Sequence, residues 1–288
     1  MEYFIHLAIM VAIYSILSLS LNLVVGYTGL LSVTQAAFYG IGAYTTAILA
    51  TSLGVNFFWS IIIGIGVAMA ISLFIGLVLS RFKDDYYALA SLGFNVITFS
   101  ILLNWSKLTR GPLGIPGIPR PAIFGFHFTS NLYFLLLVMT ILIVVYLLTY
   151  FIVNSSFGRA LKGIREHEKA LAIFGYNTRI FKMVIFIISA GIAAIAGSIF
   201  ASYITFIDPS SFTLNESIFI LSIVILGGLA DLRGSILGAI ILILLPEILR
   251  FVGFPDDLAA NLRQATYGLM LIILMFLKPQ GLFGKYKL

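Results

Sequence analysis

The chain contains no cysteine and very little charge, because only 10% of its 288 residues are Asp, Glu, Lys or Arg. The lack of cysteine excludes disulfides and thiolate metal sites. The lack of charge excludes a soluble globular fold, in which about a quarter of the residues are charged. Residues 3–80 include no acid, lysine or arginine, and His6 is the one histidine there. This whole stretch can therefore enter hydrocarbon without the roughly 3 kcal/mol that each buried charge costs.

Hydrophobic residues make up 61% of the chain and gather in long runs. A helix of about 20 apolar residues crosses a bilayer, and backbone inside lipid must be hydrogen-bonded internally. The apolar runs are 4–25, 30–53, 57–80, 86–105, 131–153, 183–206, 217–230, 234–250 and 265–277. They predict an all-α fold, a polytopic integral membrane helix bundle with about 8–10 membrane segments, some of them broken or re-entrant. We expect residues 1–288 to form a single transmembrane domain, with the first run retained as a span rather than cleaved as a signal.

The distribution of basic residues predicts how the chain is oriented. If all nine runs cross the membrane and the N-terminus lies outside, 12 of the 17 Lys and Arg residues lie in cytoplasmic segments. Cytoplasmic loops of membrane proteins carry an excess of these residues. We therefore expect the N-terminus outside and the C-terminus in the cytoplasm. The net charge of +6 reflects this topology and contact with membrane lipid, and no nucleic-acid partner is expected.

The loop at 154–182, "NSSFGRALKGIREHEKALAIFGYNTRIFK", is the one long charged segment. Ser155 or Ser156 can cap a helix, and Gly175 can end it. Its apolar residues form a stripe at Leu161, Ile164, Leu171 and Phe174. The charged block at 165–169 interrupts the stripe and predicts two short helices that meet near 165–168. Such a loop serves either as a docking knob for a partner or as a basic segment that lies on lipid headgroups.

A second loop is rich in proline and glycine. Residues 111–121, "GPLGIPGIPRP", contain four prolines and three glycines, which exclude a helix and predict a stiff, turn-rich loop. The loop is either a plain connector between two spans or a rim that meets a binding protein outside the membrane.

Motifs for catalysis and nucleotide binding are missing. The chain has no G-x4-GK[ST] signature and no soluble domain large enough to hold a nucleotide. If it pumps a solute, the energy must come from a partner. No catalytic constellation and no metal-ligand spacing such as His-x3-His is present. We therefore expect a non-enzymatic membrane subunit that binds no cofactor or metal of its own.

Five segments of the chain, in order, match a known pattern. They are "SLNLVVGYTGLLSVTQAAFYGIGAYTTAIL" at 20–49, "LTRGPLGIPGIP" at 108–119, "GRALKGIREHEKALAIFGYNTRIFK" at 158–182, "LGGLADLRGSILGAIILILLPEILR" at 226–250 and "YGLMLIILMFLKPQGLFG" at 267–284. Together they resemble the permease subunits of branched-chain amino acid ABC importers. Of the two permease types that pair in such importers, the first segment is similar to the M-type subunit.

The resemblance implies partners and a role for the charged loop. The implied partners are a second homologous permease subunit, two cytoplasmic ABC ATPase subunits that bind ATP and Mg, and an extracytoplasmic substrate-binding protein. The implied location is a bacterial or archaeal cytoplasmic membrane. In this family the loop equivalent to 154–182 is the coupling loop that docks on the ATPase. The residues to which this coupling role is carried over are Arg165, Glu166, Glu168, Lys169, Ala170 and Gly175.

The alternative that the sequence leaves open is an ion-coupled secondary transporter or channel for a small neutral or zwitterionic solute. Ion-coupled carriers commonly place charged residues near the middle of their spans, which hold almost none here, although a sodium site made of backbone carbonyls would need no charged residue. An uncharged path suits an apolar amino acid, but equally urea or a short amide. The assignment of Leu, Ile or Val as solute therefore rests on the resemblance.

The stretch 26–44, "GYTGLLSVTQAAFYGIGAY", is uncharged but contains four glycines. Inside a membrane segment these glycines predict breaks in the helix or close contacts between helices. The stretch is either a packing seam or a wall of the solute path. The residues expected on the path in the second interpretation, which the resemblance favours, are Gly29, Thr34, Gln35, Phe38, Tyr39 and Gly42.

Overall fold

The computed structural model describes residues 2–82, 84–123, 126–128, 130–251, 268–269, 280–284 and 286. Its elements are α1 (Glu2–Thr28), α2 (Gln35–Ser52), α3 (Phe57–Leu79), α4 (Asp84–Asn104), α5 (Ser106–Thr109), η1 (Gly111–Leu113), β1 (Ile115–Pro116), β2 (Ala122–Ile123), β3 (Phe126–His127), α6 (Asn131–Asn154), α7 (Ser156–Ile173), α8 (Thr178–Ile204), β4 (Phe206–Ile207), η2 (Pro209–Phe212), α9 (Leu214–Gly227) and α10 (Leu232–Phe251). The strands have two residues each and pair antiparallel as β1–β4 and β2–β3. The predicted all-α fold is confirmed.

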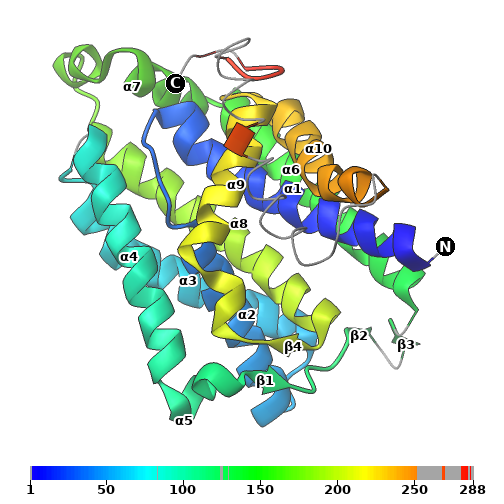
Figure 1. The fold of residues 1–288 in the computed structure, drawn as a ribbon. Coiled ribbons are helices and arrows are strands. Elements are labelled where there is room, and N and C mark those ends of the chain that lie inside the picture. Colours follow the sequence, from blue (N-terminus) through cyan, green and yellow to red (C-terminus); the bar gives the residue numbers. More distant parts are fainter. Residues whose placement is uncertain are drawn as a thin grey trace.

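The helices form a bundle with two distinct ends (Figure 1). Helix α7 lies at one end, and α5, β1 and β4 lie at the other; we call these the α7 end and the β1 end. Within the described residues, α1, α3, α4, α6 and α8 are long and apolar enough to cross a membrane. The first eight predicted runs all form helices, whereas the run 265–277 lies almost entirely outside the described residues. The polytopic helix bundle is thus confirmed.

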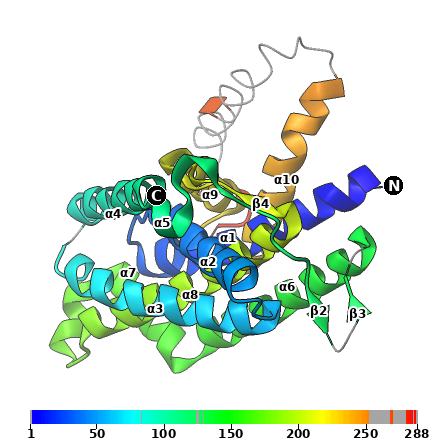
Figure 2. The ribbon, with the colours of Figure 1, turned by 90° about the horizontal axis from the view of Figure 1, so that it is seen from below.

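Helix α8 is central and packs against α1, α2 and α3, while α4 and α6 lie on opposite sides of the bundle (Figures 1 and 2). Small residues allow the close approach. A Cβ added to Gly42 of α2 would lie 2.3 Å from the carbonyl oxygen of Ala194 in α8. Between α1 and α8, the Ser20 hydroxyl donates to the Ser189 carbonyl at 2.6 Å, and the Ser189 hydroxyl donates back at 2.9 Å. In lipid no hydrophobic effect drives helices together, and such close packing and interhelical hydrogen bonds stabilise their association instead.

Residues 29–34 are not helical, although the predicted run 30–53 included them. Gly29 has a positive φ of 74° and ends α1, and α2 begins only at Gln35. Side chains of α4 bind the backbone of this segment: the Val33 N–H donates to the Ser91 hydroxyl at 3.1 Å, and the Asn95 amide donates to the Val33 carbonyl at 3.0 Å. The backbone groups of Val33 are thereby hydrogen-bonded inside the protein, which is the condition for irregular chain at membrane depth.

The connection between α9 and α10 is also irregular. Helix α9 has 14 residues, or about 21 Å at 1.5 Å per residue, which is shorter than the hydrocarbon core. Asn22 of α1 holds the turn that follows: its Oδ1 accepts from the Ala230 N–H at 3.0 Å, and its Nδ2 donates to the Ser235 hydroxyl at 2.6 Å. The expectation that some membrane segments are broken is confirmed at this turn and at 29–34.

Candidate functional site

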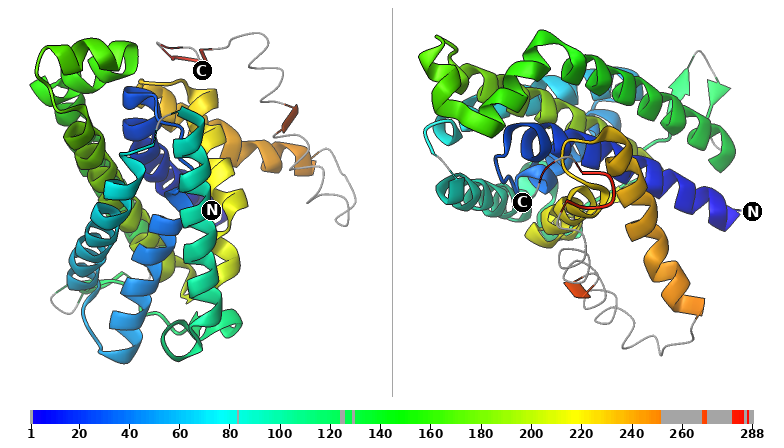
Figure 3. Two further views of the ribbon diagram at one scale, coloured as in Figure 1. Left: turned by 90° about the vertical axis from the view of Figure 1, so that its left-hand side faces the viewer. Right: turned by 90° about the horizontal axis from the view of Figure 1, so that it is seen from above.

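Helix α7 projects from the end of the bundle (Figure 3) and consists of two halves. Ser155 caps its start, with the side-chain oxygen accepting from the Gly158 N–H at 3.3 Å. His167 has non-helical angles, φ −149° and ψ 76°, which kink the helix. Gly175 follows the last turn with φ +86°, a conformation that glycine adopts without a steric penalty. The predicted pair of short helices that meet near 165–168 is confirmed.

Arg165, just before the kink, ties α7 to the end of α1. Its guanidinium donates to the carbonyl oxygen of Val25 at 3.0 Å and to that of Gly26. These carbonyls lie in the last turn of α1, where that of Val25 also accepts from the Gly29 N–H at 3.2 Å. Burial lowers the pKa of Arg165, but the guanidinium remains charged at all working pH values. A Cβ at Gly29 would lie 3.3 Å from Cγ of Arg165, so the two predicted site residues meet.

Tyr286, close to the C-terminus, covers the same arginine. The Arg165 guanidinium carbon lies 4.4 Å from the centre of the Tyr286 ring, within the range of a cation–π interaction. The Tyr286 hydroxyl donates to Glu166 Oε1 at 2.8 Å. Burial, together with this hydrogen bond, raises the pKa of Tyr286 above its usual value. Arg165 and Glu166 are therefore engaged within the chain.

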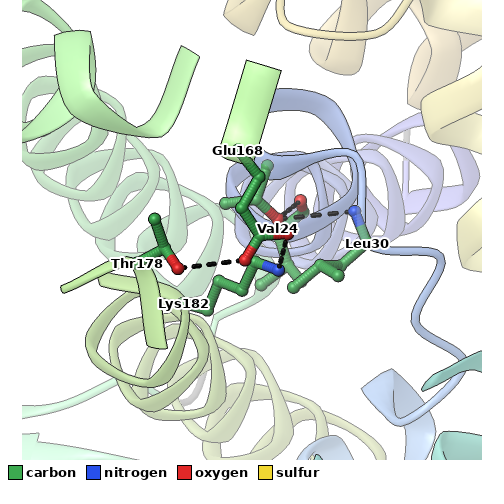
Figure 4. Close-up of polar contacts among 6 residues, drawn as sticks. Val24, Leu30, Glu168, Thr178 and Lys182 are labelled. Atoms are coloured by element: carbon green, nitrogen blue, oxygen red, sulfur yellow. Dashed lines mark hydrogen bonds and ion pairs between the residues drawn. The ribbon is translucent and has the colours of Figure 1, made fainter. Parts of the chain in front are cut away.

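Glu168, just after the kink, is bound to the start of α8 (Figure 4). Its Oε2 lies 2.7 Å from Nζ of Lys182, and its Oε1 accepts from the Thr178 hydroxyl at 3.0 Å. The Lys182 side chain is 7% exposed and that of Glu168 is 31% exposed. Because Glu168 supplies the counter-charge for a buried ammonium, it holds the second half of α7 against α8.

The outer tip of α7 is apolar and open. Ile173 is 84% exposed and Phe174 is 81% exposed. Of the apolar stripe expected in this loop, Leu161 and Ile164 are buried, Leu171 is half-buried and Phe174 is exposed. Of the other predicted coupling residues, Lys169 and Gly175 are exposed and Ala170 is partly exposed.

The second candidate site lies inside the bundle, on the 29–34 segment and α2. Thr34 and Gln35 are buried. The Thr34 hydroxyl lies 3.0 Å from that of Ser32, and the Gln35 amide donates to the Ser20 hydroxyl at 2.5 Å. Gln35 thereby joins the hydrogen-bonded pair Ser20–Ser189. The site is polar, uncharged and shared by three helices.

The next turn of α2 carries two buried aromatic rings. Phe38 lies 5.2 Å from the ring of Phe94 and 5.4 Å from that of Phe186. Tyr39 lies 5.3 Å from Phe200 and 5.1 Å from Phe212. The Tyr39 hydroxyl is buried and has no hydrogen-bond partner among the described residues. Such an orphaned group costs about 1–3 kcal/mol, and the hydroxyl of Tyr44, whose ring lies 5.8 Å from that of Phe212, is a second one beside the same rings.

All six predicted path residues are thus placed, and they continue from the Arg165 contact into the bundle. Gly29 and the Thr34–Gln35 pair lie along the non-helical segment and the start of α2, and the side chains of Phe38 and Tyr39 are each 1% exposed. Gly42, at the end of this row of residues, packs directly against the backbone of α8. In this conformation the residues pack against the chain itself, and their role as a path wall stays a prediction.

Several residues of these sites were not predicted. They are Asn22, Ser91, Asn95, Lys182 and Ser217. For the two asparagines the sequence does offer a signal. An amide within an apolar run has to find a hydrogen-bond partner, because burying it without one costs free energy. No group of three His, Asp or Glu side chains in the described ranges could hold a metal ion.

The structure is thus a polytopic helix bundle with amide and hydroxyl side chains in its interior and with a helix that projects from one end. The chain belongs to the family of branched-chain amino acid transport system permease components, whose family model matches residues 3–277. This family membership is consistent with a multi-pass membrane protein and with the resemblance found in the sequence.

Three relatives illustrate the family. The high-affinity branched-chain amino acid transport system permease protein LivM of Escherichia coli K12 is 36% identical, over 96% of this chain and 69% of that protein. A probable LivM of Methanocaldococcus jannaschii is 28% identical, over 94% of this chain and 90% of that protein. LivH of Salmonella typhimurium, a permease protein of the same kind of system, is 25% identical, over 94% and 91%. No solved structure matches the chain.

Proposed function

We propose that the chain is the permease subunit of an ATP-driven ABC importer for branched-chain, apolar amino acids. In this proposal it pairs with a second homologous permease, two cytoplasmic ABC ATPase subunits and an extracytoplasmic substrate-binding protein. The names of the relatives support this, because LivM and LivH of Salmonella typhimurium are both permease proteins of branched-chain amino acid transport. The chain itself is non-catalytic, and ATP and Mg are bound by the partner ATPases.

The observation that carries the proposal is the construction of α7. Its tip presents Ile173 and Phe174, while its base is fixed by Arg165 to α1 and by Glu168 to α8. An apolar tip on a firmly held base transmits a push or pull better than a mobile loop. We assign the ATPase contact to Ile173, Phe174 and the exposed Lys169, and the positioning of the tip to Arg165 and Glu168.

The same construction suggests how a movement of the ATPases reaches the membrane interior. The Arg165 guanidinium holds the carbonyls of Val25 and Gly26, four and three residues ahead of the non-helical segment 29–34. A displacement of α7 therefore acts directly on the place where α1 ends and the path residues begin. Two alternative packings of this segment would give outward- and inward-facing states.

The orientation and the solute complete the proposal. The positive-inside rule places α7 and the C-terminus in the cytoplasm and the N-terminus outside. Gln35, Thr34 and the Tyr39 hydroxyl supply neutral polar groups for a zwitterion, and Phe38 supplies an apolar wall for its side chain. An ion-coupled carrier or channel, the alternative, has no support from the relatives described above.

The test is uptake of radioactive leucine into proteoliposomes. The full set of two permeases, two ATPases and binding protein is expected to import leucine only with ATP. The chain reconstituted alone is expected to import nothing. Uptake by the chain alone on a sodium or proton gradient would refute the importer and favour the carrier.

A further inference from the structure

A cavity of about 300 Å³ lies at the α7 end, outside both sites described above. It is formed where four elements meet: the end of α1, the last turns of α6, α7, and the turn before α10. Its polar lining comes from Tyr27, Tyr146, Tyr150, Lys162, Asp231 and Arg233. Figure 3 shows α1 (blue) lying between α6 (green) and α10 (orange), and α1 packs against both helices.

The cavity carries two cations and one carboxylate. In the described part of the chain, neither Lys162 nor Arg233 forms an ion pair, and the Lys162 ammonium lies 5.7 Å from the centre of the Tyr27 ring. The carboxylate of Asp231 is already engaged, because its Oδ1 accepts from the backbone N–H groups of Arg233 and Gly234 at 2.9 and 3.0 Å. The two cations outnumber the one carboxylate, and this excess of positive charge favours an anionic ligand.

The depth of the cavity indicates where that ligand comes from. Tyr146 and Tyr150, whose rings stack 6.5 Å apart, precede the end of α6 at Asn154 by eight and four residues. They lie about 6–12 Å below the helix end at 1.5 Å per residue, the depth at which tyrosines meet lipid headgroups. A soluble partner protein would have to enter the headgroup layer to reach them.

Apolar surface continues from the cavity toward the middle of the membrane. On α6, Met139 and Ile143 precede Tyr146 at helical spacing and are 41% and 56% exposed. On α10, Leu237 follows Arg233 by one turn and is 36% exposed. A ligand with an anionic head in the cavity would thus have two apolar stripes beside its tail.

We propose that this cavity binds one anionic phospholipid, with its phosphate between Lys162 and Arg233 and its acyl chains along α6 and α10. The tyrosine hydroxyls donate to the headgroup oxygens. Because Lys162 belongs to α7, a bound lipid would link the base of the projecting helix to the α9–α10 turn. The inference requires that the chain spans a membrane and does not depend on which solute is carried.

The experiment is a thermal-shift titration of the purified full chain in a neutral detergent. Phosphatidylglycerol is expected to raise the midpoint of unfolding, and phosphatidylcholine with the same acyl chains is not. The double variant Lys162→Gln/Arg233→Gln is expected to weaken the apparent affinity for phosphatidylglycerol roughly 30-fold, since each cation near an anionic lipid contributes about a tenfold or smaller factor. The matched control, Lys169→Gln/Arg179→Gln, removes two exposed cations at the same end and is expected to keep the shift.

Three outcomes would overturn the proposal. An equal loss of phosphatidylglycerol affinity in the control variant would mean that lipid binding depends on the general surface charge and not on this cavity. An equal shift with inorganic phosphate would assign the cavity to a free anion. If the first double variant fails to fold, the charge-keeping exchange Lys162→Arg/Arg233→Lys serves instead, and loss of the shift there, despite a folded chain, would contradict binding through charge.

Discussion

Glu168 and Lys182 form an ion pair of 2.7 Å that joins the second half of α7 to the first turns of α8, with the ammonium almost completely buried. The two residues are 14 positions apart and belong to the same basic loop in the sequence. The pair gives the loop a fixed geometry at the point where the chain re-enters the bundle. A loop that lay loosely on lipid headgroups would have no need for a buried lysine with its own carboxylate.

Glu168→Gln is expected to destabilise the chain by about 1–3 kcal/mol, because it leaves the Lys182 ammonium buried without its counter-charge. The measurement is the unfolding midpoint in detergent. Lys169→Gln, at the exposed neighbouring position, is the control and is expected to leave the midpoint unchanged. The exchange Glu168→Lys/Lys182→Glu is expected to recover part of the loss, and no recovery would show that the pair is not the cause.

Phe174→Ala is expected to weaken the binding of the ATPase subunits by about tenfold or more, since a well-placed aromatic anchor contributes roughly 2 kcal/mol to an interface. The ring is 81% exposed and supports nothing within the bundle, so the midpoint of unfolding is expected to stay the same. Co-purification of tagged ATPase with the variant measures the effect.

The control for this variant is Phe4→Ala, which removes a ring of similar exposure, 73%, at the start of α1. The α1 start lies far from α7 (Figure 1), and this variant is expected to bind ATPase as the parent chain does. Normal ATPase binding by Phe174→Ala would mean that the tip of α7 is not the contact.

Gly42→Ala is expected to destabilise the bundle by about 1–3 kcal/mol, because the added methyl group would meet the Ala194 backbone and force α2 away from α8. Gly66→Ala, in α3, is the matched control: a Cβ there meets nothing within 4 Å, so the change is expected to stay within about 1 kcal/mol. Thermal unfolding of both variants in one detergent makes the comparison. Equal midpoints would rule out tight α2–α8 packing at this glycine.

Tyr39→Phe is expected to keep or slightly raise stability while lowering leucine uptake. The hydroxyl is buried without a partner among the described residues, and removal of such a group relieves a cost of about 1–3 kcal/mol. If the hydroxyl serves the solute, the concentration of leucine for half-maximal uptake is expected to rise several-fold. Unchanged uptake, measured at equal expression, would assign Tyr39 to packing alone.

The sequence predicts most of the bundle because the apolar runs and charged breaks are local signals. The kink in α7 is also local: the block at 165–169 interrupts the apolar stripe, and the helix bends at His167. The start of α2, by contrast, depends on contacts with residues far away in the sequence. Nothing within 30–53 indicates that helix begins at Gln35, because the backbone of the preceding residues is held by Ser91 and Asn95 from another helix.

In the candidate site, too, some features have a local sequence signal and others depend on contacts set by the fold. The sequence identifies Arg165 and Glu168 as residues of the coupling loop, but their partners, the Gly26 carbonyl and Lys182, depend on how α1 and α8 are placed. The exposure of Phe174 has no local signal either, because it depends on where α7 ends relative to the bundle. The orphaned Tyr39 hydroxyl has no signature in sequence at all, since it depends on the rings packed around it.

The hydrogen bonds at the start of α2, directly after the 29–34 segment, constrain the order in which the chain can fold during synthesis. The N–H of Ala36, in the first turn of α2, donates to the hydroxyl of Ser217, and the amide of Asn95 donates to the same hydroxyl. Ser217 is made 181 residues after Ala36. A nascent chain that ends before α9 therefore lacks the group that accepts these two hydrogen bonds, and α2 cannot reach its final hydrogen-bonded state as an independently inserted helix. Completion of the N-terminal half has to await the C-terminal half.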